Sequence, residues 1–194
     1  MQAWKHFKTI THHKYLVMQG CFRVGLYWQG LVHDLSKYSP TEFGIGMRYY
    51  PGTRSPNAAE RDEKGYSEAW MHHKGRNRHH YEYWTDLNVA TGSYESVPMP
   101  RKYLVEMIMD RIAACKTYQG KAYTPGSALA YFERSMERNL MHPELKRQLH
   151  YLLAKLKEEG EEKTFTEANG RSSSSGMSEM SFRTTTDSIL WLCS

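Results

Sequence analysis

One stretch narrows the choice of fold more than any other: RKYLVEMIMDRIAACKTY, residues 101–118. Its apolar side chains recur every four residues, at Leu104, Ile108 and Ile112, which is the spacing of one helix face. Asp110 lies on an otherwise apolar face of this predicted helix. A carboxylate in such a place is costly unless it is paired or bound to a metal ion. The stretch therefore predicts a buried helix that carries a functional carboxylate.

The other segments favour an all-α fold. Residues 5–33 are predicted to be helical, with Gly20, Gly25 and Gly30 allowing close packing or breaks. A helix is expected from "SPTEF", where Ser39 is the N-cap and Glu42 completes a capping box. Two more helices are expected within 124–136 and 142–162, and loops at 51–63 and 90–100. No segment alternates like a strand for long, so a compact helical bundle is expected.

The chain divides into a predicted helical domain, residues 1–160, and a flexible Gly/Ser-rich linker with a short C-terminal tail, residues 161–194. Hydrophobic residues make up 40% of the chain, which indicates a globular protein and excludes a disordered one. No run approaches the ~18 apolar residues that a membrane helix needs. The first residues lack the apolar region of a signal peptide, so no membrane partner is expected.

The net charge and the cysteine content indicate which ligands and which cellular compartment to expect. The formal net charge of +5 favours anionic ligands such as phosphates, but it does not indicate a nucleic-acid partner. The 3 cysteines are widely spaced and form no CxxC motif, which argues against a disulfide framework and fits a reducing, cytoplasmic location. The oligomeric state stays open.

Histidines concentrate in WMHHKGRNRHHYEYW, residues 70–84, which holds two adjacent pairs. If this segment is helical throughout, Trp70, His73, Asn77, His80 and Trp84 form one inward stripe. His73 and His80 are then the expected metal ligands. A wetter neighbouring stripe would hold His72, Arg76, His79 and Tyr83. If "GRN" breaks the helix, His79 replaces His80 as the alternative.

A His-Asp pair supplies the second chemical signal. His33 and Asp34 end an apolar helical segment in "LVHDLSK". An imidazole binds one ion, while the two oxygens of a carboxylate can bridge two ions. With His13 upstream and Asp110 downstream, the order of candidate ligands is His, His-Asp, His, His, Asp. This order predicts one or two divalent transition-metal ions between helices, with Mn, Fe, Co, Ni and Zn all compatible.

This order resembles that of the HD-domain superfamily, the all-α metal-dependent phosphohydrolases. "HHKYLV" is similar to its first-histidine helix, "LVHDLSK" to its namesake motif, and "EMIMDRIA" to the helix with its final aspartate. More narrowly, "HDLSKYSPTEF", "HHKGRNRHHYEYW" and "MPRKYLVEMIMDRIAA" resemble a small bacterial and phage family of unknown function. The resemblance covers residues 6–118. Ser36 stands where HD proteins often have glycine.

The expected chemistry is hydrolysis of a small phosphorylated substrate, a phosphomonoester or phosphodiester, with nucleotides among the candidates. Asp34 would hold the metal that activates water, and Lys37 would neutralise a phosphoryl oxygen. Glu106, one helical turn before Asp110, would orient a metal-bound histidine; His72, His79 and Arg76 would surround the metals or face the substrate. Two alternatives remain open: a di-iron oxygenase of the HD type, and a non-catalytic module that binds nucleotide or metal.

Overall fold

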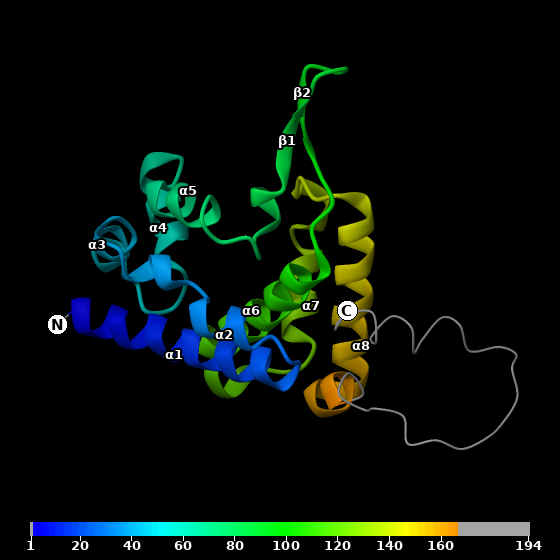
Figure 1. Ribbon diagram of the computed structural model, residues 1–194. Coiled ribbons are helices and arrows are strands. Elements are labelled where there is room, and N and C mark those ends of the chain that lie inside the picture. Colours follow the sequence, from blue (N-terminus) through cyan, green and yellow to red (C-terminus); the bar gives the residue numbers. More distant parts are fainter. Residues whose placement is uncertain (1, 167–194) are drawn as a thin grey trace, which may run out of the picture.

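The computed structural model describes residues 2–166, and within them the fold is mainly helical (Figure 1). The long helices are α1, α6 and α8, and shorter helices lie between them. The α-helices are α1 (Gln2–Arg23), α2 (Tyr27–Val32), α3 (Pro40–Arg48), α4 (Pro56–Lys64), α5 (Glu68–Lys74), α6 (Arg101–Gln119), α7 (Ser127–Glu133) and α8 (Pro143–Thr166). Short 3₁₀ turns are η1 (Leu35–Tyr38), η2 (Tyr81–Tyr83), η3 (Gly120–Ala122) and η4 (Met136–Arg138). The predicted all-α class is confirmed.

The core forms where α1 packs on α6 and where α7 and α8 cover the other side of α6. Val17 of α1, Leu104 of α6, and Phe132 of α7 are almost completely buried in one continuous apolar cluster. Gly20 allows close approach of α1 to α6, because a Cβ there would lie 2.8 Å from the Met109 sulfur. Burial of this apolar area holds α6, and with it Asp110, in a fixed position.

The break between α1 and α2 positions the His-Asp pair. Gly25 has a φ of +78°, and the helical segment predicted over 5–33 breaks at this glycine, one of three at which a break was allowed. α2 then runs back along α1 and ends just before His33. The Lys14 ammonium of α1 donates hydrogen bonds to the carbonyls of Leu31 and His33, at 2.7 and 2.8 Å. These bonds satisfy carbonyls that the short helix leaves open and fix where it ends.

Helices α3, α4 and α5 form a second group beside the N-terminal half of α1 (Figure 1). The Ser39 hydroxyl accepts a hydrogen bond from the Glu42 amide, so the predicted start of α3 is confirmed. The predicted loop over 51–63 is wrong from Pro56 onward, where α4 begins after the N-cap Ser55. The signal is the same Ser-Pro pair that begins α3, which favours a helix start.

The segment after α5 departs most from expectation. A helix through residues 70–84 is wrong: α5 ends at Lys74, and a turn leads through Gly75 to the 3₁₀ turn η2. An antiparallel hairpin of β1 (Thr85–Asn88) and β2 (Ser93–Ser96) follows, which the sequence did not indicate, and it extends away from the helices (Figure 1). Because these strands have only 4 residues each, no long alternating pattern marks them.

The C-terminal helix passes the predicted domain boundary. α8 continues through a kink at Gly160 to Thr166, so residues 161–166 are helical where a linker was expected. The remaining part of the expected linker and tail lies outside the described residues. Within residues 2–166, no helix is both long and apolar enough to span a bilayer.

Candidate metal centre

Asp34 lies at the centre of the histidine cluster. It stands between α2 and η1 with a φ of +53°, a left-handed conformation that aspartate tolerates better than most residues. Its side chain is 2% exposed. Its two carboxylate oxygens face different groups of side chains: Oδ2 faces His33 and His13, and Oδ1 faces His73 and His79. One carboxylate therefore joins two groups of candidate ligands.

The first group comes from α1, the end of α2, and α6. His13, His33, Asp34 and Asp110 each offer one ligand atom, and these atoms lie within 4.8 Å of one another. The His13 Nε2 is 2.9 Å from Asp110 Oδ1, and the His33 Nε2 is 3.2 Å from Asp34 Oδ2. All four predicted residues of this group are brought together.

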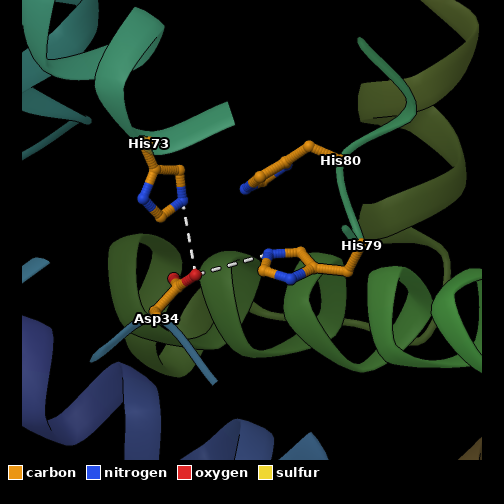
Figure 2. Close-up of side chains that lie close together, drawn as sticks. All are labelled: Asp34, His73, His79 and His80. Atoms are coloured by element: carbon orange, nitrogen blue, oxygen red, sulfur yellow. Dashed lines mark ion pairs between the residues drawn. The ribbon is translucent and has the colours of Figure 1, made fainter. Parts of the chain in front are cut away.

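The second group forms around the other side of Asp34. His73 at the end of α5, together with His79 and His80 from the following segment, converges on Asp34 (Figure 2). The Nε2 atoms of His73 and His79 are 3.3 and 3.4 Å from Asp34 Oδ1. The four ligand atoms again lie within 4.8 Å of one another. This group thus contains His79 as well as the two histidines expected as ligands.

Glu106 contacts two of these rings at Nδ1, the ring nitrogen on the side away from the centre. Its Oε1 accepts a hydrogen bond from His33 Nδ1 at 2.9 Å and lies 3.2 Å from His79 Nδ1. A ring that carries its proton on Nδ1 turns the Nε2 lone pair toward the centre, as a metal ligand requires. Glu106 therefore contacts two histidines of the cluster, and its predicted role of orienting a metal-bound histidine stays a prediction.

Glu42 binds two histidines of α5 in the same way, a role that the sequence does not indicate. Its two oxygens lie 2.6 Å from His72 Nδ1 and 2.8 Å from His73 Nδ1. His73 is thereby oriented toward Asp34, while His72 is linked to the centre through Glu42. Burial raises the pKa of Glu42, but hydrogen bonds from His73 and His72 outweigh this and lower it, so the group stays a carboxylate.

The inward atoms lack the partners that buried polar atoms normally have. Apart from the close approaches within the cluster, Nε2 of His33 and of His79 and Oδ1 of Asp34 are buried and form no hydrogen bond with any described residue. With both imidazole protons on Nδ1, two lone pairs would face a carboxylate oxygen. Such an arrangement is unfavourable without a cation between the acceptors. The donor set, imidazole and carboxylate, suits a divalent transition metal.

Charges in the cluster keep its carboxylates ionised. Burial raises the pKa of Asp34, but the neighbouring His33, Lys37 and His73 bring it well below its usual range. The pKa of Asp110 is likewise far below normal, because the close approach of His13, and then of His33, outweighs the effect of burial. Burial, with His79 and His73 nearby, lowers the pKa of His80 strongly, so this imidazole is neutral near pH 7. His33 differs, because Asp34, Asp110 and Glu106 outweigh its burial and raise the pKa of this imidazole well above its usual value. A metal ion that binds His33 would therefore displace a proton from the ring, since metals bind ionised carboxylates and neutral imidazoles.

Of the remaining predicted residues, Lys37 lies beside the cluster and Arg76 lies on the exposed surface. The Lys37 ammonium lies 2.6 Å from Asp34 Oδ2 and is 27% exposed, so it borders both the cluster and solvent. Burial disfavours its charge, but Asp34 and Asp110 raise the pKa of Lys37 above its usual value. Arg76 is exposed and donates a hydrogen bond to the backbone carbonyl of His72, and it is in neither of the two groups of candidate ligands.

One further buried histidine lies near the centre. His6 is 5% exposed, and Gly46 makes room for it, because a Cβ there would lie 2.3 Å from the His6 ring. Burial and then the charge of Lys37 lower the pKa of His6 to about 4. His6 lies seven residues before His13, which places both rings on one face of α1. From this spacing the inward position of His6 could have been inferred.

The geometry yields an expectation about the second histidine pair. His79→Ala should reduce metal affinity by at least tenfold, as much as His73→Ala, because both rings face Asp34 and both are held by a carboxylate. His80→Ala should cost less, since no carboxylate orients its ring among the described residues. Metal content of each purified variant would be measured by mass spectrometry, with His72→Ala as the matched control. A larger loss for His80→Ala than for His79→Ala would contradict this assignment.

Comparison with known proteins gives one match. No curated protein and no solved structure matches the chain. A family model does match, over residues 2–155, a range that includes both ligand groups, Glu42, Glu106 and Lys37. The chain belongs to the family of unknown function DUF5662.

Proposed function

We propose that this protein is a divalent-metal-dependent phosphohydrolase of the HD type. Its substrate class would be phosphomonoesters or phosphodiesters, with nucleotides among the candidates. The observation that carries the proposal is the position of Asp34, whose two oxygens face two separate groups of imidazoles. A bridging carboxylate between two ligand groups is the arrangement that a two-metal hydrolytic site needs.

The residues have distinct roles in this proposal. One ion would be held by His13, His33, Asp34 and Asp110, and a second by Asp34, His73 and His79, with His80 beside them. Bound divalent ions would lower the pKa of a coordinated water and polarise the phosphoryl group. Glu106 and Glu42 keep the imidazoles aimed inward. Lys37 would place its ammonium against the charge that develops on a phosphoryl oxygen.

Positive charge near the centre favours hydrolysis of phosphates over the oxygenase alternative. A cavity that reaches His13 and Asp110 is also lined by Lys37, Arg61 and Arg111. Cations at the mouth of a metal site attract and orient an anionic substrate. An oxygenase acting on a neutral organic substrate would have no use for them. The free, buried thiols of Cys21 and Cys115 are compatible with the proposed cytoplasmic location.

The test is phosphate release from a panel of phosphomonoesters and phosphodiesters. The full chain would be assayed after loading with Mn²⁺, Fe²⁺, Co²⁺, Ni²⁺ or Zn²⁺, with chelator-treated protein as the control. We expect metal-dependent release from at least one class of ester. Oxygen consumption by anaerobically prepared iron-loaded protein, without phosphate release, would instead establish the oxygenase. Tight ligand binding with neither reaction would establish a binding module.

A further inference from the structure

A large cavity extends from the candidate metal centre along α6. Its volume is about 790 Å³, within the range of ~300–1,000 Å³ typical of small-molecule sites. At one place it is lined by His13, Lys37 and Asp110, and elsewhere by residues of α3–α5, α7 and the segments between them. This volume is far larger than a phosphate group alone would need. The cavity can therefore hold the organic part of a substrate as well as the group that reacts.

One face of α6 forms a wall of this cavity. Asp110, Arg111, Ala114, Cys115 and Tyr118 all line it. These positions follow the i, i+1, i+4, i+5, i+8 spacing, which places them on one side of the helix. The small side chain of Ala114 leaves open space between Asp110 and Tyr118, one turn away on either side. A ligand anchored at the metal centre would thus have room to lie along this wall.

Arg111 is a partly buried cation on this wall. Its guanidinium carbon lies 5.6 Å from the centre of the Phe132 ring, and its Nε is buried without a hydrogen bond to any described residue. Arg54, which also lines the cavity, is by contrast paired with Asp62. A buried N–H donor without an acceptor costs free energy, and a guanidinium prefers a carboxylate or phosphate. Arg111 is therefore positioned to receive an anion from the cavity.

We propose that Arg111 binds the phosphate group of a nucleotide-sized phosphate monoester, whose organic part lies over Ala114 toward Tyr118. In this pose the phosphate points toward Asp110 and Lys37. That direction rests on the proposed function. A phosphate monoester fits better than a neutral ligand, because two cations, Lys37 and Arg111, line the same cavity as Asp110. Burial raises the pKa of Tyr118, so its phenol stays protonated and can donate a hydrogen bond to the organic part.

The experiment measures binding rather than turnover, on the metal-loaded full chain by calorimetry. The probes are inorganic phosphate and a phosphonate analogue of adenosine 5′-monophosphate, which the proposed hydrolysis cannot cleave. Arg111→Gln should keep its metal content and weaken binding of both probes by about tenfold or more, the usual effect of losing a hydrogen bond to a charged group. Arg147→Gln, on the exposed surface of α8, is the matched control and should bind both probes as the wild type does.

A second variant tests the position of the organic part. Ala114→Leu should leave binding of inorganic phosphate unchanged and weaken binding of the nucleotide analogue, because the added side chain fills the open part of the wall. Ala114→Val serves the same purpose if the leucine variant does not fold. Equal binding of the nucleotide analogue by wild type and the folded Ala114 variant would overturn the proposed orientation.

The outcomes separate this inference from the proposed function. Wild-type phosphate affinity in Arg111→Gln, or no binding of either probe by the wild type, would overturn the role of Arg111 even if esters are hydrolysed. Weakened binding in Arg111→Gln together with no hydrolysis of any ester would support the binding site and refute the hydrolase.

Discussion

Asp34→Asn is expected to lose nearly all of its bound metal, with affinity falling by on the order of a hundredfold or more, and to show no hydrolysis above background. Asparagine keeps the size of the side chain and also tolerates the left-handed backbone at this position. The substitution therefore removes charge without a steric change. Because both carboxylate oxygens face candidate ligands, one substitution should affect both groups of histidines.

Two further variants show whether the loss of metal is specific to Asp34. Asp86→Asn, on the exposed strand β1, is the matched control and should keep full metal content. His13→Ala removes a side chain from the first group only, so it should leave part of the metal bound by the second group. The free energy of unfolding of each variant, measured in urea without added metal, separates loss of binding from loss of folding. Full metal content in folded Asp34→Asn would refute the proposed centre.

The first ligand group was predictable from the sequence because its members lie in or directly beside regular helices. The apolar periodicity around Asp110 fixes α6 in the core, and the same reasoning places His13 on a buried face of α1. His33 and Asp34 follow α2 directly, but Trp28 and Leu31 of this short helix are exposed, so its apolar residues do not set the direction of the pair. For His13 and Asp110 the local pattern determines which way the side chain points, and the adjacent His-Asp pair was recognised by residue type.

The second group was predictable only in part. A helical stripe assigns side-chain directions only while the helix continues, and α5 ends at Lys74. Beyond Gly75 the chain turns, and spacing no longer shows whether His79 or His80 faces the metals. The position of His79 is determined by Glu106, a contact between residues far apart in the sequence. Such contacts leave no local periodicity from which to infer them.

Glu42 shows how a correct local interpretation can conceal a second role. The capping-box pattern explains why α3 begins at Pro40, and the Ser39 half of it is present. The carboxylate of Glu42, however, binds His72 and His73 of α5. A residue that satisfies one local rule gives no sequence signal of a partner thirty residues away. The contacts between α3 and α5 supply that information.

Lys37→Met is expected to retain metal and fold but to slow hydrolysis by on the order of a hundredfold, the usual effect of removing one group that stabilises developing charge. An ammonium has no lone pair to donate, so Lys37 cannot be a ligand. Its contribution is a positive charge held 2.6 Å from Asp34 and open to the cavity. Methionine keeps an unbranched stem in the same space while removing that charge.

Lys37 and Arg111 are expected to act at different steps, Lys37 in the chemical reaction and Arg111 in substrate binding. If Lys37 acts on charge that develops during the reaction, its loss should lower kcat with little change in KM, whereas loss of Arg111 should raise KM through weaker binding. Lys121→Met, on the exposed turn η3, is the matched control. A Lys37→Met variant that hydrolyses the ester at the wild-type rate would remove Lys37 from the mechanism. One that loses its metal as well would assign Lys37 to the maintenance of the Asp34 carboxylate, because the ammonium is among the charges that hold the pKa of Asp34 low.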